Sequence, residues 1–216
     1  MTTTWVISDT HFGHAKCWEV FKGADGVSPM RPFTSTEEMD ETMVDNWNRV
    51  VGKNDRVIHV GDVVINKKFL PILDRLNGIK ELVEGNHDQH KNKALLVPYF
   101  RKCSAMKEIA GIVFSHFPMH PDSVERFGTN VHGHLHSERV MWDVLKIDED
   151  ELQHHPDQSP YRKVREIDPR YFNVSVEQIN YTPISVEDLR IRIKEQQEAA
   201  GYEPKKAWGS GSNPAI

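Results

Sequence analysis

Residues 3–14 read TTWVISDTHFGH and decide the fold of the N-terminal half. Hydrophobic and β-branched side chains run from Thr3 to Ser8 and then give way to polar residues, which predicts a buried strand that leads into a loop. Asp9 and His11 stand two residues apart, so in extended backbone their side chains project to the same side and can hold one ion together. The stretch therefore predicts a β-strand with a candidate ligand pair at its end.

The same pattern, an apolar strand followed by a polar turn, occurs twice more. Residues 56–60 are followed by Gly61-Asp62, and residues 79–83 by Gly85-Asn86-His87-Asp88. Strands that alternate with helices in this way pair in parallel, and their carboxyl ends then meet in one crevice. We therefore expect the polar turns to lie close together. The Gly-Asn-His-Asp turn is the more informative of the two, because it has no obvious packing purpose.

Helical periodicity marks three further segments. Residues 37–51 follow a capping box formed by Ser35 and Glu38, and their Met and Trp side chains repeat at the spacing of a core-facing helix. Residues 69–76 are predicted to form a second amphipathic helix, and residues 185–198 a capped and charged one. Together with the strands, these helices predict an α/β fold.

The second half of the chain has a different character. Residues 106–115 are predicted to form a hairpin that ends next to His116, and residues 130–132 a strand that runs into Gly133-His134-Leu135-His136. Residues 171–176 are predicted to be the last strand. Residues 138–170 are rich in Asp, Glu, His and Pro without a clear period, so we expect a polar surface excursion.

Length and composition limit the class of protein. A chain of 216 residues with 38% hydrophobic and 27% charged residues fits one domain. We expect this domain to span residues 1–198, followed by a flexible C-terminal tail over residues 199–216, which contains Gly and Ser. No apolar run approaches the roughly 20 residues needed to cross a bilayer, and the N-terminus lacks the pattern of a signal peptide.

Charge and cysteine content restrict the partners and the compartment. The net charge is 27 minus 32, or −5, so bulk basicity for binding nucleic acid is missing and any phosphate affinity must be local. Two cysteines, Cys17 and Cys103, favour free thiols in a reducing compartment. We therefore expect a cytoplasmic protein that does not bind membranes, whose oligomeric state the sequence does not define.

The order of the polar motifs resembles the calcineurin-like metallophosphoesterases. That order is Asp-x-His, Gly-Asp, Gly-Asn-His-Asp, a strand-end His and Gly-His-x-His, each after a predicted strand. Within the family, five shorter segments look like a compact bacterial and phage branch. These segments are residues 8–14, 31–33, 46–48, 115–118 and 173–176.

The resemblance implies a four-layer αββα sandwich of two mixed β-sheets flanked by helices, with two divalent metal ions at the sheet edge. One ion would be held by Asp9, His11, Asp62 and His136. The other would be held by Asn86, His116, His134 and the shared Asp62 carboxylate. Imidazole together with carboxylate and amide oxygen suits a transition metal, which is Mn, Fe, Zn, Ni or Co, better than Mg.

The resemblance also implies a reaction, the direct attack of a metal-bridging hydroxide on a phosphate ester. His87 would donate the proton to the leaving group, and Asp88 beside it would orient an imidazole. His14 and Arg31 belong to the branch-like motifs without being implied metal ligands, so we expect them to contact the substrate. Ile65 stands where the family often has an Asp, which affects only the surroundings of the ligands.

We therefore predict a phosphodiesterase that acts on small or nucleotide-type phosphate esters. Three alternatives stay open at this point. A nuclease has only a modest basic cluster between residues 162 and 170 in its favour. A phosphomonoesterase or protein phosphatase of the same fold is a second alternative, although the chain is short for protein substrates. A catalytically silent, metal-stabilised binding scaffold is the third, and the unligated His87 argues against it.

Overall fold

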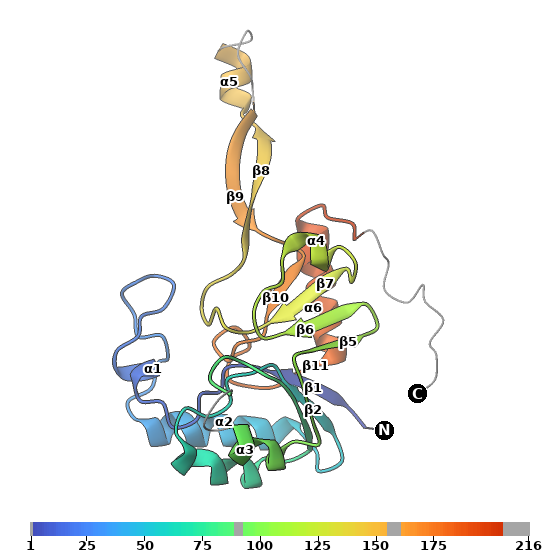
Figure 1. The fold of residues 1–216 in the computed structure, drawn as a ribbon. Helices are drawn as coiled ribbons and strands as arrows, with labels where there is room; N and C mark the ends of the chain where they lie inside the picture. Colours follow the sequence, from blue (N-terminus) through green and yellow to red (C-terminus); the bar gives the residue numbers. More distant parts are fainter. Residues whose placement is uncertain (1, 89–92, 155–160, 205–216) are drawn as a thin grey trace. The chain divides into compact units, whose positions relative to one another are not determined.

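The computed structural model describes residues 2–88, 93–154 and 161–204 (Figure 1). The chain divides into two compact units, one of residues 1–138 with 169–216, the other of Arg139–Asp168. The second unit coincides closely with the segment predicted to be an excursion. Most of the predicted tail, residues 205–216, lies outside the described residues.

The first unit contains a five-stranded sheet in the order β11-β1-β2-β3-β4. Strands β1 to β4 are parallel, and β11 pairs antiparallel with β1 at the edge. The three strands predicted in the N-terminal half are confirmed. The strands span Thr4–Ile7 (β1), Arg56–His59 (β2), Ile79–Val83 (β3), Lys102–Ser104 (β4) and Ile184–Ser185 (β11).

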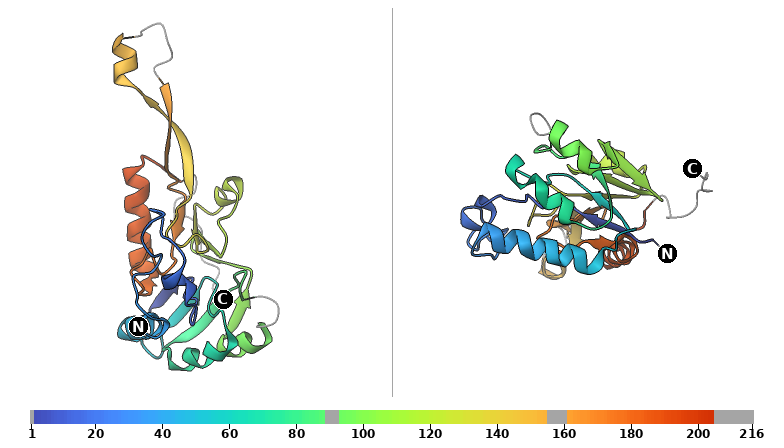
Figure 2. Two further views of the ribbon diagram at one scale, coloured as in Figure 1. Left: turned by 90° about the vertical axis from the view of Figure 1, so that its left-hand side faces the viewer. Right: turned by 90° about the horizontal axis from the view of Figure 1, so that it is seen from below.

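Helices cover one face of this sheet (Figures 1 and 2). Helix α2 begins as predicted, because the Ser35 side chain accepts a hydrogen bond from the Glu38 amide, and it buries Met39, Met43 and Trp47. The helix predicted over residues 69–76 is instead a 3₁₀ helix, because Pro71 lacks the amide that an α-helix would use. The elements are α1 (Lys16–Glu19), α2 (Thr36–Val50), η1 (Lys67–Arg75), α3 (Lys93–Leu96) and η3 (Val97–Tyr99).

A second sheet has four strands in the order β10-β7-β6-β5. The predicted hairpin is confirmed, since β5 and β6 pair antiparallel around Ala110 and Gly111, which both have positive φ. The strand expected over residues 171–176 stops at Asn173, and it is not the last one, because β11 follows. The elements are β5 (Met106–Ile109), β6 (Ile112–Ser115), α4 (Pro121–Val124), β7 (Thr129–His132) and β10 (Tyr171–Asn173).

The two sheets are joined by backbone pairing and by a shared hydrophobic core. Ser8 forms a parallel bridge with Ser175, so the segment after β1 runs beside the segment after β10. Ile58, Phe114 and Val131 belong to one buried cluster that contains residues of both sheets. Helix α6 (Val186–Ala199) begins at Ser185 as predicted and adds Leu189 and Ile193 to that cluster. This architecture of two mixed sheets with flanking helices confirms the predicted fold.

The second unit is a regular antiparallel hairpin. Strand β8 (Met141–Ile147) pairs along its whole length with β9 (Tyr161–Ile167), and α5 (Glu149–His154) follows β8. No period was evident in the sequence of this segment, but in the structure Trp142 and Val144 alternate with more exposed residues, as in a strand. Within the part of the chain that the structure describes, no helix has the length and apolar character that a membrane span requires.

Candidate metal centre

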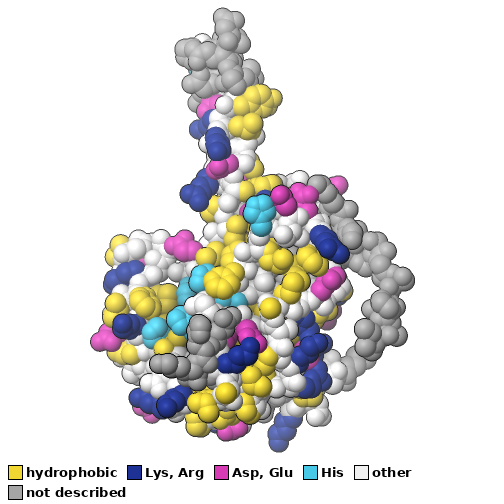
Figure 3. Space-filling view, viewed as in Figure 1, with side chains coloured by type: hydrophobic (Ala, Val, Ile, Leu, Met, Phe, Trp, Pro, Cys, Tyr) yellow, Lys and Arg dark blue, Asp and Glu magenta, His cyan; other side chains and the backbone are white. Residues whose placement is uncertain are grey.

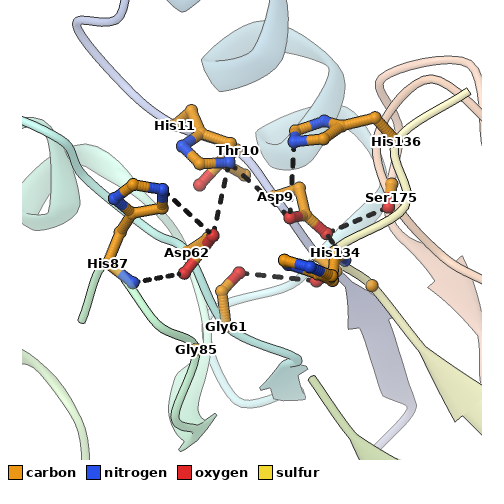
Figure 4. Close-up of polar contacts among 12 residues, drawn as sticks. Asp9, Thr10, His11, Gly61, Asp62, Gly85, His87, His134, His136 and Ser175 are labelled. Carbon is orange, nitrogen blue, oxygen red and sulfur yellow. Dashed lines mark hydrogen bonds and ion pairs between the residues drawn. The ribbon is translucent and has the colours of Figure 1, made fainter. Parts of the chain in front are cut away.

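The polar residues that end the strands meet at one edge of the two sheets (Figure 4). They come from the loops that follow β1, β2, β3, β6 and β7, all of which run parallel to a neighbouring strand. Positive φ angles are costly for residues with a side chain and gather at functional sites. Five described residues of this cluster adopt them, namely Asp9, His11, Asp62, His134 and His136.

The first group of candidate ligands consists of Asp9, His11 and His136. Each offers one ligand atom, and these atoms lie within 4.8 Å of one another. The Asp9 Oδ1 atom is 3.6 Å from His11 Nε2 and 3.9 Å from His136 Nε2. Asp9 and His11 are buried, whereas the His136 side chain is 23% exposed, so this group opens to solvent on the His136 side.

The second group consists of Asp62, His116 and His134, with ligand atoms again within 4.8 Å. The Asp62 Oδ2 atom is 3.3 Å from His116 Nε2 and 3.6 Å from His11 Nε2, so it lies between the two groups. Asn86 Oδ1 is 3.0 Å from His116 Nε2. The structure thus brings together all seven residues that the resemblance implied as ligands, with the Asp62 carboxylate at the place of the shared ligand.

Several buried atoms in this cluster have no hydrogen-bond partner among the described residues. They are Asp9 Oδ1 and both ring nitrogens of His11. A buried polar atom without a partner carries a desolvation cost of roughly 1–3 kcal/mol, so such atoms call for an explanation. Carboxylate oxygen and imidazole nitrogen are ligands of first-row transition metals. A bound cation would satisfy these atoms, so the residues fit the metal centre that the family pattern implies.

Other buried groups hold the candidate ligands in place. Ser175 Oγ and the His134 amide both donate to Asp9 Oδ2, which leaves Oδ1 free to point toward His11. His116 Nδ1 lies 2.9 Å from the Val60 carbonyl oxygen and donates to it, so Nε2 is the ring nitrogen that can bind a cation once it has lost its proton. His136 Nδ1 is 3.1 Å from Glu177 Oε1, which fixes that ring in the same way.

Arg31 does not reach the substrate region, so the expectation that it contacts substrate was wrong. The residue is fully buried, and its Nε donates to Glu177 Oε1 at 2.7 Å. Its Nη1 and Nη2 donate to the carbonyls of Thr10 and Asp9 at 2.8 and 2.5 Å. Arg31 therefore positions the loop that carries Asp9 and His11 and offsets the charge of Glu177.

Asp88 also differs from its predicted role as an orienting partner of an imidazole. Its carboxylate is buried and accepts hydrogen bonds from the backbone amides of Asp62, Val63 and Gly85 at 2.7–2.9 Å. The side chain therefore binds backbone amides rather than an imidazole, and it ties the loop after β3 to the loop after β2. Burial, as the largest influence, raises its pKa.

His87 and His14 lie at the rim of the cluster. The His87 side chain is 51% exposed, and its Nε2 is 3.9 Å from Asp62 Oδ2, while its amide donates to Asp62 Oδ1. His14 is half-buried and its ring centroid is 5.7 Å from that of His11. Burial, with the charges of His11 and Arg31, lowers the pKa of His14 to about 4. His14 is therefore neutral at pH 7 and offers a hydrogen bond rather than a charge.

Electrostatics couple the binding of a cation in this cluster to the release of a proton. Burial opposes ionisation of Asp9, but the nearby His11 imidazole, with Nε2 3.6 Å from Oδ1, and the charges of His136 and His116 outweigh it and lower its pKa. Burial would lower the pKa of His116, yet the Asp62 hydrogen bond and the Asp9 charge raise it to about 9. A cation that binds His116 must therefore displace a proton, so its affinity falls with falling pH.

Glycines allow the loops to approach one another closely. A Cβ atom on Gly61 would lie 2.7 Å from the Gly85 amide nitrogen, and one on Gly85 would lie 2.6 Å from the Asp62 amide nitrogen. A Cβ atom on Gly133 would overlap Ser8 Oγ and the Asp9 carboxylate. Only glycine fits at these positions without moving a candidate ligand.

Three contributors escaped the sequence reasoning. Glu177 and Ser175 follow β10, far along the chain from the ligands they contact. Ser175 lies in the segment 173–176, which was noted only for resemblance, and no local pattern sets Glu177 apart. Phe117 packs its ring against the His134 ring at 4.4 Å between centroids. Its place directly after His116, in a motif that was noted only for resemblance, was the one signal that could have drawn attention to it.

Comparisons with known proteins agree with this geometry. The family model described as calcineurin-like phosphoesterase matches residues 2–184. The uncharacterized protein MJ1445 of Methanocaldococcus jannaschii is 32% identical over 200 residues, covering 91% of this chain and 93% of the relative. The Gene 66 protein of Mycobacterium phage L5 is 28% identical over 176 residues, covering 65% of this chain and 81% of the relative.

Among solved structures, the protein of unknown function AQ665 from Aquifex aeolicus is similar in fold. The TM-score is 0.55 and the sequence identity 23%, and the match covers 89% of this chain and all of the other. At this identity the likeness supports the fold alone.

Proposed function

Since the chain belongs to the calcineurin-like phosphoesterase family, we propose that it is a dinuclear metal-dependent phosphodiesterase that hydrolyses small or nucleotide-type phosphate esters. Asp9, His11, Asp62 and His136 would hold one ion, and Asp62, Asn86, His116 and His134 the other. The observation that carries this proposal is the pair of ligand groups on either side of the Asp62 carboxylate, with buried atoms that lack partners.

The charge of such a centre suits an anionic substrate. Two divalent ions bring +4 and the carboxylates of Asp9 and Asp62 bring −2, because neutral imidazole and amide ligands add no charge. The filled site therefore keeps a charge of about +2, although the whole chain carries −5. Phosphate is thus attracted to this one place. Arg31 cannot provide that attraction, because its guanidinium is buried and bonded to Glu177 and backbone carbonyls.

Paired metal ions, when bound, activate water for in-line attack and neutralise charge on the phosphate oxygens. The protein residues provide the rest of the chemistry. His87 is exposed, belongs to neither ligand group, and lies within 3.9 Å of the Asp62 carboxylate, so it can donate a proton to the leaving oxygen. His14 offers a neutral hydrogen bond at the rim. The loops that carry the candidate ligands are held in place by Asp88, Glu177 and Arg31.

Metal dependence tests this proposal directly. After exhaustive chelation, confirmed by elemental analysis, the protein should lose hydrolysis of bis(4-nitrophenyl) phosphate. Activity should return with Mn, Ni or Co better than with Mg, because the ligand set is rich in imidazole. Phosphomonoesters and short nucleic acids should then rank below small diesters, with cyclic nucleotides counted among the small diesters.

The outcomes separate the alternatives. Full activity without metal would disprove the dinuclear proposal. A preference for monoesters would indicate a phosphomonoesterase of the same fold, and a preference for nucleic acid would indicate a nuclease. Metal binding without turnover of any ester would indicate a binding scaffold.

Both cysteines are free, and this agrees with the reducing cytoplasm in which we propose that the enzyme acts.

A further inference from the structure

Phe117 lies beside the candidate metal centre with much of its surface in solvent. Its ring centroid is 4.4 Å from that of His134 and 5.1 Å from that of His116, so it packs on two candidate ligands of the same group. Even so, 48% of the residue is exposed. A phenyl ring in this position presents an apolar face to the organic part of any phosphate ester that occupies the centre.

Phe21 forms a second exposed aromatic wall. It is 41% exposed, and its ring meets the edge of His14 at 5.6 Å between centroids. His14 in turn lies 5.7 Å from His11, so this wall adjoins the first ligand group rather than the second. In Figure 3 the His side chains gather on one face of the molecule with hydrophobic side chains beside them.

The two walls differ in their relation to His87. The centroid of the His87 ring is 5.4 Å from that of His11, so His87, like His14, adjoins the first ligand group. In Figure 4 the His87 and His134 rings lie on opposite sides of the Asp62 carboxylate, and Phe117 packs on His134. A general acid stands beside the leaving group. The wall formed by Phe117 therefore faces the ester group that stays on the phosphorus.

We propose that Phe117 is a specificity-determining residue that contacts the retained ester group of a phosphodiester and selects a flat aromatic group there, such as an aryl ring or the base of a nucleoside. This inference rests on the proposed function and names its substrate class. A diester has two organic groups and the site has two aromatic walls, whereas a monoester would leave the wall at Phe117 without a contact. Stacking on an aromatic side chain discriminates without hydrogen bonds, so several planar groups should be accepted.

Two esters with the same leaving group test this contact. Bis(4-nitrophenyl) phosphate and 4-nitrophenyl methyl phosphate differ only in the retained group. In the metal-loaded protein, Phe117→Ala should lower kcat/KM for the bis-aryl ester by roughly 5- to 20-fold, mainly through KM, and leave the methyl ester nearly unchanged. Phe117→Trp should keep the preference for the bis-aryl ester, because a larger ring can still stack.

Two further variants serve as references. Phe21→Ala should lower kcat/KM equally for both esters, because both carry the same leaving group. Ile191→Ala removes another exposed apolar side chain, 53% exposed on α6, and should change neither ester. Equal loss on both esters in Phe117→Ala, or an unchanged preference in a variant with normal metal content and melting temperature, would overturn the inference.

A binding measurement distinguishes this inference from the proposed reaction. Diphenylphosphinate and methyl(phenyl)phosphinate carry carbon–phosphorus bonds and cannot be hydrolysed. Calorimetry should show that Mn-loaded protein binds the diphenyl compound more tightly, and that Phe117→Ala loses this difference. If the wild type hydrolyses no ester but still binds the diphenyl compound more tightly, and Phe117→Ala does not, the proposed function fails and the contact stands. If esters are hydrolysed and the difference is missing, the contact is wrong and the function stands.

Discussion

Two clusters of this protein bury carboxylates, but only in one of them does every carboxylate oxygen accept a hydrogen bond. On β3, Glu81 is 3% exposed and its two oxygens accept from Arg56 at 2.7 Å and from Arg101 and Lys107. At the candidate metal centre, Asp9 is fully buried, yet its Oδ1 atom faces histidine nitrogens and accepts no hydrogen bond among the described residues. The Glu81 carboxylate has protein partners for both of its oxygens, whereas the Asp9 carboxylate keeps one buried oxygen without a partner, which a cation would satisfy.

The backbone is regular around the first cluster and strained around the second. Glu81 lies within a regular strand, and Lys107 on β5 reaches it from the other sheet, so the cluster ties the two sheets together. Asp9 and Asp62 lie in loops with positive φ, beside glycines that permit close approach. A satisfied cluster on regular backbone stabilises a fold, while unsatisfied ligands on strained backbone indicate function.

The largest expected effect comes from removing the carboxylate between the two ligand groups. Asp62→Ala should lower bound metal at both sites and reduce ester hydrolysis by roughly 10³-fold or more. The matched change Glu81→Ala should keep full metal content and lose only stability. Metal analysis and kinetics on both variants check the contrast. Normal metal content and turnover in Asp62→Ala would show that the shared ligand has been misplaced.

The next effect concerns proton transfer rather than metal binding. His87→Ala should keep both metals and lose roughly 10²- to 10⁴-fold in rate on alkyl or nucleoside esters. Aryl esters should lose less, because a nitrophenolate leaves without a proton. Rates on one alkyl and one aryl ester of equal charge, with metal content measured in the same sample, give the required ratio. A uniform loss would make His87 a positioning residue, and loss of metal would make it a ligand.

A smaller effect is expected where a glycine lets a loop approach a ligand. In Gly133→Ala the new Cβ atom would overlap Ser8 and the Asp9 carboxylate, which should lower metal affinity by roughly 10- to 100-fold. Gly23→Ala is the control, because its Cβ atom would meet no atom closer than 3.8 Å. Titration of each apoprotein with Mn measures the difference. Equal affinities in the two variants would contradict the proposed close packing at Asp9.

The smallest effect is on stability and depends on pH. Burial opposes ionisation of Glu81, but hydrogen bonds from Arg56, Lys107 and Arg101 outweigh it and lower its pKa to about 2. Because the folded pKa lies below the unfolded value, the stabilisation is complete above about pH 5 and disappears as the pH falls toward 2. Glu81→Gln should therefore lower the free energy of unfolding by about 2 kcal/mol at pH 7. This is less than the full pKa shift of Glu81 would give, because the Arg and Lys side chains paired with it are partly exposed to solvent.

Urea unfolding of the wild type and Glu81→Gln at pH 7 and near pH 3 measures this change. The difference in unfolding free energy should shrink at the lower pH, and activity per folded molecule at pH 7 should stay the same. A difference that does not depend on pH would show that packing, and not charge, accounts for the contribution of Glu81.

Local patterns were sufficient for most of the strands and for the ligand types. The apolar run before Asp9 and the glycines before Asp62 and Asn86 place those residues at strand ends, which follows from chain-local preferences. The same reasoning failed for η1, where Pro71 changes the helix type, and for the hairpin of β8 and β9, whose alternation is hidden among charged residues. Helix boundaries at Ser35 and Ser185 were predictable, because each cap is formed by a neighbouring residue.

What the sequence alone determined is the order of most strands and of the long helices, together with the residue types at the strand ends, since these depend on neighbours along the chain. The tertiary structure alone decided which side chains face the candidate metal centre and which hold those side chains in position. Arg31 belongs to a segment noted for the family resemblance and Asp88 to the motif that contains Asn86, yet burial and backbone hydrogen bonds make both of them positioning residues. Glu177 meets His136 and Arg31 only because the segments after β1, β7 and β10 run together, and no local pattern encodes such long-range contacts.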